Sequence, residues 1–417
     1  MKSTVLLGVM LISTSITAQE TVTVSTAAGN TEQLYYNLQN GSTQALWQLS
    51  DWDLAFESTG ITGAILLNTA KGHRLYKAPY AIGQWAAVDT AGLGNNWPVQ
   101  YNSTSDWSSG AFNQGLTSNP FDLGWGIYNF TTHNITGDSL FILHTADGAW
   151  KKLRMDGFAT VTTSFTFTMA DLDGANQQVG TINRNAYVTK NFGYYSFATM
   201  SAVDLEPVAA DWDLLFTKYN GFVPQPVPSI YPVTGVLQNK EVRVAQVDGI
   251  ATNLAQWAGQ ALVSDIDVIG YDWKNFNMTT FMFEYAADRT YFVQDRNNNV
   301  WKLIFTGYGG GATGDITFTK ELVSATSVEE TNAPADLVVY PNPVVNGTLR
   351  IVLDGNVRSA QLSIHDMSGK LVLQQQVSGS GSLALLPVDV GTLQEGLYLV
   401  RLDAGTRSFT TRVVIGR

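Results

Sequence analysis

The body of the chain carries the same short motifs twice, in the same order. The pair Tyr35-Tyr36 returns at Tyr194-Tyr195, and the run Asp-Trp-Asp-Leu-Ala-Phe at 51–56 returns as Asp-Trp-Asp-Leu-Leu-Phe at 211–216. Further matches join Thr62-Gly63 with Thr234-Gly235, Trp150-Lys151-Lys152-Leu153 with Trp301-Lys302-Leu303, and residues 165–168 with 316–319. Because order and spacing agree, the sequence predicts two homologous domains of about 150 residues, at 20–170 and 178–322.

The repeated blocks have the pattern of β-strands. In the first copy Trp52, Leu54 and Phe56 alternate with polar or small residues, so they share one face of a strand. The same alternation places Asp51 and Asp53 on the opposite face, and predicts that the paired carboxylates of both copies lie in solvent.

Turn residues between apolar runs predict hairpins. Residues 291–293 and 300–305 flank the polar segment 295–299, and residues 141–143 and 150–153 flank Asp147-Gly148. Asn, Asp and Gly tolerate the backbone conformations of tight turns. Helical periodicity is nearly absent, apart from a possible short helix at 253–263. The predicted fold class is therefore mostly β.

Composition narrows the functional classes. The 417 residues hold 24 Lys and Arg against 35 Asp and Glu, a net charge of -11, which disfavours sequence-independent binding to nucleic acid. The chain has no Cys, so disulfides, thiolate metal sites and catalytic thiols are excluded. We expect no nucleic-acid partner.

The first residues predict an export signal. Lys2 precedes a mostly apolar run from Val5 to Ile16, and small residues end in Ala18, so residues 1–18 have the pattern of a signal peptide. No later stretch approaches the roughly 20 uninterrupted apolar residues of a membrane helix. We expect an exported protein without a membrane-spanning segment.

The C-terminal part differs from the body. Residues 323–337 are rich in Ser, Thr, Ala and acids, a composition typical of a linker. Residues 338–417 contain short alternating runs at 349–353, 360–365, 370–375, 396–402 and 408–415, separated by Gly-containing turns. This spacing predicts a compact β-sandwich.

The tail resembles the C-terminal sorting domain of the type IX secretion system of Bacteroidetes. The resemblance is carried by Tyr340-Pro341-Asn342-Pro343 with Gly347, by Gly369 and Lys370, and by Gly396 and Tyr398. It implies the type IX secretion machinery as a partner, and a secreted or outer-membrane surface location. In this family the tail is often removed after export.

The body resembles the HmuY family of surface and secreted haem-binding proteins of the same phylum. The motifs that carry the resemblance are residues 194–197, 212–219 and 291–318 in the second copy and residues 35–38, 52–56 and 141–153 in the first. It implies two HmuY-like β-rich domains in tandem before the β-sandwich sorting domain, and haem as a ligand.

Haem capture requires an axial donor, a His nitrogen or a Met sulfur. His133 lies in roughly the region where the family carries an axial His, and is the first candidate. The second copy has no His, and Met278 is the replacement there, with Met282 as an alternative. His73 is interpreted as a turn residue, His144 as a solvent-facing strand residue, and His365 belongs to the tail.

No enzyme is predicted. The paired Asp residues lack the burial that acid catalysis needs, residues 295–299 lack the Gly and Glu of a calcium loop, and no Gly-x-Ser-x-Gly, His-Glu-x-x-His or phosphate-loop motif occurs. The predicted function is non-catalytic ligand binding, with haem as the ligand. The alternative is an adhesion module for glycans or proteins, using Trp residues outside the repeated strands: Trp85, Trp97, Trp107, Trp125 and Trp257.

Overall fold

The computed structural model describes residues 19–60, 63–93, 97–224, 227–324, 337–354, 360–367, 369–377, 383–404 and 407–416. The chain divides into two compact units, Met1–Ser327 and Val328–Arg417. Regular structure in the described residues is nearly all antiparallel strand, which confirms the mostly β fold class. The predicted signal peptide lies outside the described residues, as does most of the predicted linker.

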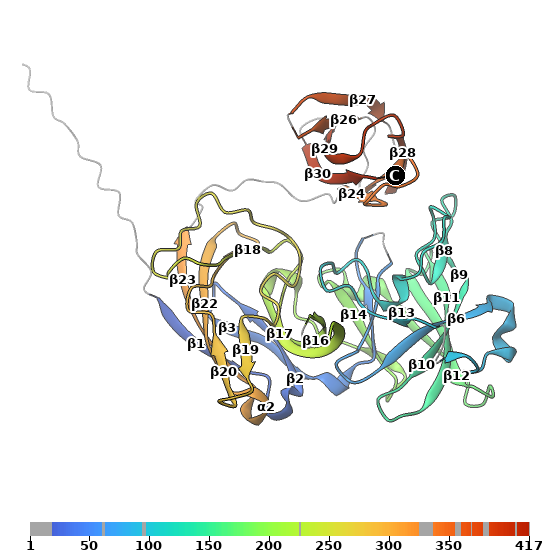
Figure 1. Cartoon of the computed structure of the whole chain (residues 1–417). Helices are drawn as coiled ribbons and strands as arrows, with labels where there is room; N and C mark the ends of the chain where they lie inside the picture. The colour runs from blue at the N-terminus through green and yellow to red at the C-terminus, as the bar shows by residue number, and fades with distance from the viewer. Residues whose placement is uncertain are drawn as a thin grey trace, which may run out of the picture. The chain divides into compact units, whose positions relative to one another are not determined.

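The first unit contains two lobes with equivalent sheets (Figure 1). We call residues 49–208 lobe 1. Its larger sheet has the order β13 (Gln178–Asn183), β12 (Ser164–Asp171), β11 (Trp150–Ala159), β10 (Ser139–His144), β6 (Arg74–Ala81) and β7 (Val99–Gln100), and β11 also pairs with the hairpin β8 (Gly126–Tyr128) and β9 (Ile135–Gly137). Its smaller sheet has the order β15 (Ser201–Val203), β14 (Phe192–Ser196), β4 (Leu54–Glu57) and β5 (Ile65–Leu67).

Lobe 2 consists of residues 20–48 together with residues 209–324. Its larger sheet has the order β1 (Glu20–Ser25), β23 (Asp315–Ser324), β22 (Val300–Tyr308), β21 (Thr290–Gln294) and β18 (Arg243–Val247). Its smaller sheet has the order β17 (Ser229–Gln238), β16 (Leu214–Val223), β2 (Glu32–Asn37) and β3 (Ser42–Gln48), and a separate hairpin is formed by β19 (Lys274–Asn277) and β20 (Met282–Tyr285).

The first strands of each sequence copy pair with strands of the other copy, and thereby complete the lobe that the rest of the other copy forms. In lobe 2, β1 pairs with β23 and β2 pairs with β16. In lobe 1, β13 pairs with β12 and β14 pairs with β4. Figure 1 shows the blue N-terminal strand β1 in the same sheet as the orange β22 and β23. The spatial lobes therefore differ from the sequence copies 20–170 and 178–322, because each copy donates its opening strands.

Each lobe has a core that reflects this exchange. In lobe 2 the donated side chains Val22, Leu34 and Tyr36 are buried in one cluster with Phe216 and Phe318. The lobe 1 cluster likewise joins Phe56 and Phe167 to Tyr195, which lies on the donated strand β14. Since burial of apolar surface is the main favourable term in folding, the donated strands are integral to both cores.

Strand pairing also corrects two details of the sequence interpretation. Both hairpins form as predicted. Leu153 pairs with Phe141 in lobe 1, and Leu303 pairs with Tyr291 in lobe 2, so Lys152 is equivalent to Lys302. The sequence match of Trp150 with Trp301 is therefore wrong by one residue. The predicted helix at 253–263 is also wrong. That segment forms isolated turns, and Gly259 adopts a φ of +83° that a helix does not allow.

Helices are short throughout the described residues. The α-helix α2 spans Gly310–Thr313. Turns of 3-10 helix lie at Ala28–Asn30, Leu49–Asp51, Ile82–Ala87, Ala111–Asn113, Arg184–Tyr187 and Ala209–Asp211.

The second unit consists of two sheets around one apolar cluster. One sheet has the order β24 (Leu337–Tyr340), β25 (Thr348–Asp354) and β28 (Leu383–Asp389), and the other β27 (Leu371–Val377), β26 (Ala360–Asp366), β29 (Gly396–Ala404) and β30 (Arg407–Ile415). Val344, Leu349, Ile364 and Val400 lie in the shared core. The predicted β-sandwich is present.

Candidate functional site

Each lobe anchors its donated strand with one aspartate. Asp53 accepts a hydrogen bond from the backbone N–H of Phe197 at 2.5 Å, and Asp213 accepts one from Leu38 at 2.7 Å. Both carboxylates are nearly inaccessible, 1% and 4% exposed, so the prediction that they lie in solvent is wrong. The reason is the exchange: each carboxylate meets the end of a strand that is distant in sequence.

The surroundings of Asp53 compensate its charge. His73 Nε2 and Lys71 Nζ each lie 2.6 Å from Asp53 Oδ1, and His73 Nδ1 accepts the N–H of Ala146, so Nε2 is the donor toward Asp53. Burial alone raises the pKa of Asp53, but the hydrogen bonds from His73, Lys71 and Phe197 outweigh it and hold the pKa below its ordinary value. His73 is buried and directly follows the turn at residues 69–72.

Among the described residues Asp213 forms no ion pair, although the charges of Arg296 and Lys320 act on it from a greater distance. Register places Val242 where lobe 1 has His73, because Val244 pairs with Val293 as Leu75 pairs with Leu143. Burial raises the pKa of Asp213 to about 6, and the hydrogen bond from Leu38 only partly opposes this. The two equivalent aspartates therefore differ: the ionised form is favoured for Asp53 in lobe 1 and disfavoured for Asp213 in lobe 2.

The lobes meet through equivalent aromatic residues. The hydroxyls of Tyr35 and Tyr194 hydrogen-bond each other at 2.9 Å, and each ring packs edge-on against a Trp of a repeated motif: Tyr35 against Trp212 at 5.0 Å and Tyr194 against Trp52 at 5.1 Å between centroids. This arrangement relates the two copies by an approximate twofold axis. The repeated aromatic residues therefore build the seam as well as the cores.

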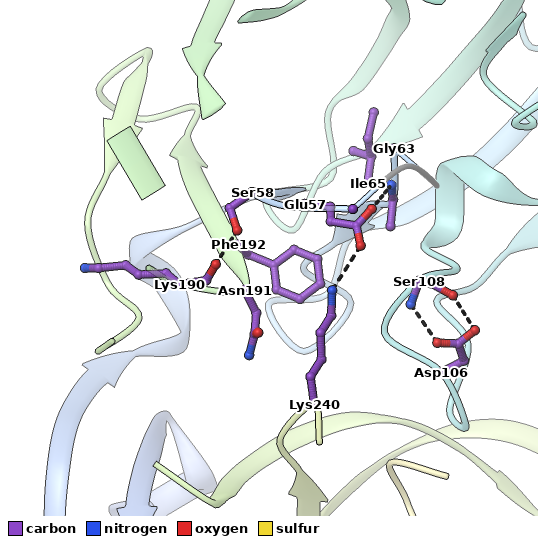
Figure 2. Close-up of polar contacts among 12 residues, drawn as sticks. Glu57, Ser58, Gly63, Ile65, Asp106, Ser108, Lys190, Asn191, Phe192 and Lys240 are labelled. Carbon is purple, nitrogen blue, oxygen red and sulfur yellow. Dashed lines mark hydrogen bonds and ion pairs between the residues drawn. The ribbon is translucent and has the colours of Figure 1, made fainter. Parts of the chain in front are cut away.

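Charged groups at the seam break the symmetry. Figure 2 shows Lys240 of lobe 2 extending toward Glu57 of lobe 1, with Nζ 2.9 Å from Oε1, beside the ring of Phe192. Glu206 accepts the backbone N–H groups of Asn191 and Phe192. Burial raises the pKa of Glu206 to about 7, because these bonds and the charge of Lys240 only partly offset desolvation.

A cleft opens between the lobes beside this seam. Four aromatic rings line it, those of Trp52, Trp107, Tyr194 and Tyr219, together with amide and hydroxyl side chains. Its cavity volume of about 70 Å³ is far below the roughly 300–1,000 Å³ of drug-sized ligand sites. The cleft therefore suits one edge of a ligand rather than a whole porphyrin.

Most polar groups of the cleft already serve the fold. Gln33 accepts from Trp52 Nε1 and donates to Tyr35, and Trp107 Nε1 donates to the carbonyl of Gln238 at 2.8 Å. The exception is Asn220, whose Oδ1 is buried and has no partner among the described residues. An unpaired buried acceptor costs about 1–3 kcal/mol, so a ligand hydroxyl or N–H that reached it would be stabilised.

The predicted haem donors lie on equivalent hairpins. In both turns the N–H of the fifth loop residue donates to the first residue's carbonyl: His133 to Asn129 and Phe281 to Asn277, each at 2.8 Å. His133 is therefore equivalent to Phe281, and Met278 to Phe130. The two hairpins are equivalent, but His133 and Met278 occupy different positions in their loops.

Neither hairpin forms an enclosed site. His133 Nδ1 is 2.6 Å from the Tyr128 hydroxyl, and neighbouring Phe130 is 51% exposed. Met278 and Met282 are 73% and 66% exposed. His144 packs on Trp150 at 4.3 Å between ring centroids. Neither His133 nor Met278 lines the inter-lobe cleft or the two open grooves of about 490 and 510 Å³ in the part of the chain that the structure describes.

The Trp residues considered for ligand stacking have different roles. Trp125 is fully buried and Trp97 nearly so, and Trp85 is partly covered. Trp107 lines the cleft, and Trp257 is 37% exposed in a separate groove of lobe 2. Sequence alone did not separate these roles, because all five lie outside the repeated strands.

The part of the chain that the structure describes has neither a cluster of metal-binding side chains nor a helix that could cross a membrane. It contains no group of three His, Cys, Asp or Glu side chains arranged to hold a metal ion. Asp295 instead closes its own turn, accepting N–H bonds from Asn297 and Asn299 and one from Trp301 Nε1. In the same described ranges, no helix has the length and apolar character to cross a membrane.

The motif residues of the tail support its turns and edges. Asn342 accepts the N–H of Val414 and thereby fixes the Tyr340-Pro341-Asn342-Pro343 segment to β30. Gly347 and Gly369 adopt φ values of +68° and +85°, which a side chain would strain. Lys370 donates its N–H to Asp366, and the Tyr398 hydroxyl donates to the carbonyl of Gln394.

Comparison with known proteins identifies the tail. Residues 338–416 match the family described as the secretion system C-terminal sorting domain. This confirms the type IX sorting prediction and places the protein in the secreted or cell-surface class. No curated protein matches the chain.

Similarities to solved structures are remote. A putative lipoprotein of Bacteroides fragilis is 12% identical over 39% of this chain and 92% of its own, with a TM-score of 0.17. The BSP domain of a biofilm-associated protein is 10% identical over 91% of this chain and 68% of its own, with a TM-score of 0.16. An α-2-macroglobulin of Escherichia coli is 10% identical over 96% of this chain and 43% of its own, with a TM-score of 0.15. At these TM-scores the similarities establish neither fold nor activity.

Proposed function

We propose that the body is a non-catalytic binding module for neutral, hydroxyl-bearing ligands such as glycans at the cell exterior. The sorting tail supplies the export route. The observation that carries the proposal is the buried, unpaired Oδ1 of Asn220 in a cleft lined by Trp52, Trp107, Tyr194 and Tyr219. Aromatic faces stack on the apolar face of a sugar ring, and the orphan acceptor supplies a place for a hydroxyl.

The charges of the cleft support a neutral ligand and binding without catalysis. Among the described residues that line it there is no carboxylate and no imidazole, and Lys218 is the single cation. Acid–base catalysis needs a titratable group within hydrogen-bond reach of the reacting atom. The cleft offers amides, hydroxyls and rings, which orient a ligand but do not transfer protons at neutral pH.

A glycan array with the purified exported protein tests the proposal, followed by calorimetry on the glycans that bind. Asn220→Ala and Trp107→Ala should each weaken binding by about tenfold, since each removes a contact worth roughly 1–2 kcal/mol. Trp257→Ala, which alters an exposed Trp outside the cleft, is the matched control. Equal binding by all three variants would refute the cleft as the site.

Haem capture by HmuY-like domains is the second candidate. It is supported by His133, whose Nδ1 lies 2.6 Å from the Tyr128 hydroxyl: with Nδ1–H donating to that oxygen, the Nε2 lone pair is available to iron. It is also supported by the equivalent hairpin that carries Met278. Because Phe130, Met278 and Met282 are exposed on these hairpins, haem would be held at the surface. Titration with haemin should then give a Soret band that weakens in His133→Ala but not in His144→Ala. Absence of any spectral change at micromolar haemin would remove this candidate.

A further inference from the structure

In lobe 1 an indole ring covers a buried lysine on the outer face of the larger sheet. The ring of Trp85 lies 5.0 Å from Lys152 Nζ, and the carbonyl of Trp85 accepts from the same ammonium at 3.0 Å. Trp85 Nε1 donates to Gln177 Oε1 at 3.1 Å, and the guanidinium of Arg154 also lies over the ring. Lys152, Arg154 and Gln177 therefore form a receptor for an indole of the same chain.

Lobe 2 repeats two parts of that receptor. Strand register makes Lys302 equivalent to Lys152. It makes Gln19 equivalent to Gln177, because Glu20 pairs with Lys320 as Gln178 pairs with Met169. Ile304 replaces Arg154, so one of the two cations is lost.

Among the described residues, no aromatic ring forms a cation–π contact with Lys302. Lys302 and Gln19 instead line an open groove with a volume of about 490 Å³, with Trp257 and Glu321 among its other walls. The groove therefore lies where lobe 1 holds its own indole.

The ammonium of Lys302 is poorly satisfied in this groove. Its side chain is buried, and among the described residues it donates a long hydrogen bond of 3.4 Å to the carbonyl of Ala255 and forms no ion pair with a carboxylate. A buried ammonium without close acceptors or a covering ring is costly. A ligand that supplied the missing ring would be stabilised by the cation–π contact.

We propose that this groove of lobe 2 binds an indole, presented either as a tryptophan side chain of a partner polypeptide or as a free small molecule. The ring of the ligand lies over Lys302, and its N–H donates to the Gln19 side chain, as the N–H of Trp85 donates to Gln177 in lobe 1. An anionic ligand is disfavoured, because Glu321 lines the groove and the chain carries a net charge of -11. The site is separate from the inter-lobe cleft, so this inference does not depend on the glycan proposal.

Fluorine NMR with 5-fluoroindole tests the inference on the purified exported protein, because the probe is distinct from the eleven Trp residues of the chain. The wild-type protein should show saturable binding at one site. Lys302→Met should weaken it by about tenfold, because methionine keeps the aliphatic stem but removes the cation. Lys152→Met is the matched control and should leave it unchanged, because Trp85 already fills the lobe 1 receptor.

A third variant tests the equivalence of the lobes directly. Trp85→Ala should empty the lobe 1 receptor and raise the stoichiometry from one site to two, with folding verified by circular dichroism. Competition then separates the sources. Displacement of the probe by N-acetyltryptophanamide identifies a side chain of a polypeptide, and displacement by indole alone identifies a free small molecule. Absence of saturable binding, or equal binding by wild type and Lys302→Met, would overturn the proposal.

Discussion

Lobe 1 and lobe 2 have equivalent sheets but are built from the chain in different ways. Lobe 1 is continuous from residue 49 to residue 208, whereas lobe 2 needs the strands of residues 20–48 to complete both of its sheets. The N-terminal strands thus close the last lobe of the body. The difference shows that a repeat in sequence need not be the unit that folds.

Deletion of residues 20–48 is expected to have the largest effect. Lobe 2 would lose the buried side chains of Val22, Val24, Leu34, Tyr36 and Leu38. At roughly 1.5–3 kcal/mol for each large apolar side chain, the loss is about 10 kcal/mol, comparable with the stability of a whole domain. Hydrogen exchange should show loss of protection in residues 209–324 and retention in residues 49–208. Protection of both lobes in the deleted chain would contradict this.

The two anchoring aspartates should respond to neutralisation with opposite signs. Asp53→Asn removes the charge that pairs with Lys71 and accepts from His73, and we expect it to lower the free energy of unfolding by about 3 kcal/mol at pH 7. Asp213→Asn keeps an acceptor for Leu38 and removes a charge that burial disfavours. We expect it to raise the free energy of unfolding by about 2 kcal/mol. Urea denaturation of both variants measures the contrast.

The partner of Asp53 provides the control. His73→Val copies the lobe 2 environment into lobe 1, and should reduce the cost of a subsequent Asp53→Asn substitution by at least about 1 kcal/mol. Destabilisation of similar size by Asp53→Asn and Asp213→Asn would show that the two environments do not differ as described.

Stability should depend on pH in opposite directions at the two aspartates. The pKa of Asp213 is raised to about 6 and that of Glu206 to about 7, so the stability these groups contribute in their protonated forms is lost as pH rises from about 4 to 7. The pKa of Asp53 is lowered, so its contribution is present above about pH 4 and is lost as pH falls through its folded value.

Denaturation curves measured from pH 3 to pH 8 check these signs. Asp213→Asn should flatten the decline between pH 4 and pH 7 and leave the loss in acid unchanged. An unchanged slope in this variant would rule out Asp213 as a source of the decline.

The smallest effect is expected at the twofold contact. Tyr35 bonds both Tyr194 and Gln33, whereas Tyr194 has the single bond to Tyr35 in the described contacts. Tyr35→Phe should therefore cost about 1–2 kcal/mol and Tyr194→Phe about 1 kcal/mol, with a coupling of about 0.5–1 kcal/mol in the double-mutant cycle. Zero coupling would mean that the hydroxyl contact does not contribute to the seam.

Several features of the candidate sites could be predicted from sequence and several could not. The equivalent hairpins that carry His133 and Met278 could be matched, because both are short segments at the same point of a repeat. The burial of Asp53 could not, because its partner Phe197 lies on a strand that the other copy donates. The indole receptor around Lys302 could not be predicted, because the sequence matches Trp150 with Trp301 and so pairs Lys302 with Lys151, whereas strand register makes Lys152 its equivalent.

Sequence by itself determined the mostly β class, the two copies of the body and the sorting tail. Alternation, turn residues and the tail motif are properties of a few neighbouring residues, so they can be read without contacts. The tertiary structure decided which copy completes which lobe, which aspartate has a cation beside it, and which lysine lacks a covering ring. These depend on pairing and burial between residues that are separate in sequence, by 18 positions for Asp53 and Lys71, 67 for Lys152 and Trp85, and 175 for Asp213 and Leu38, where local pattern carries no information.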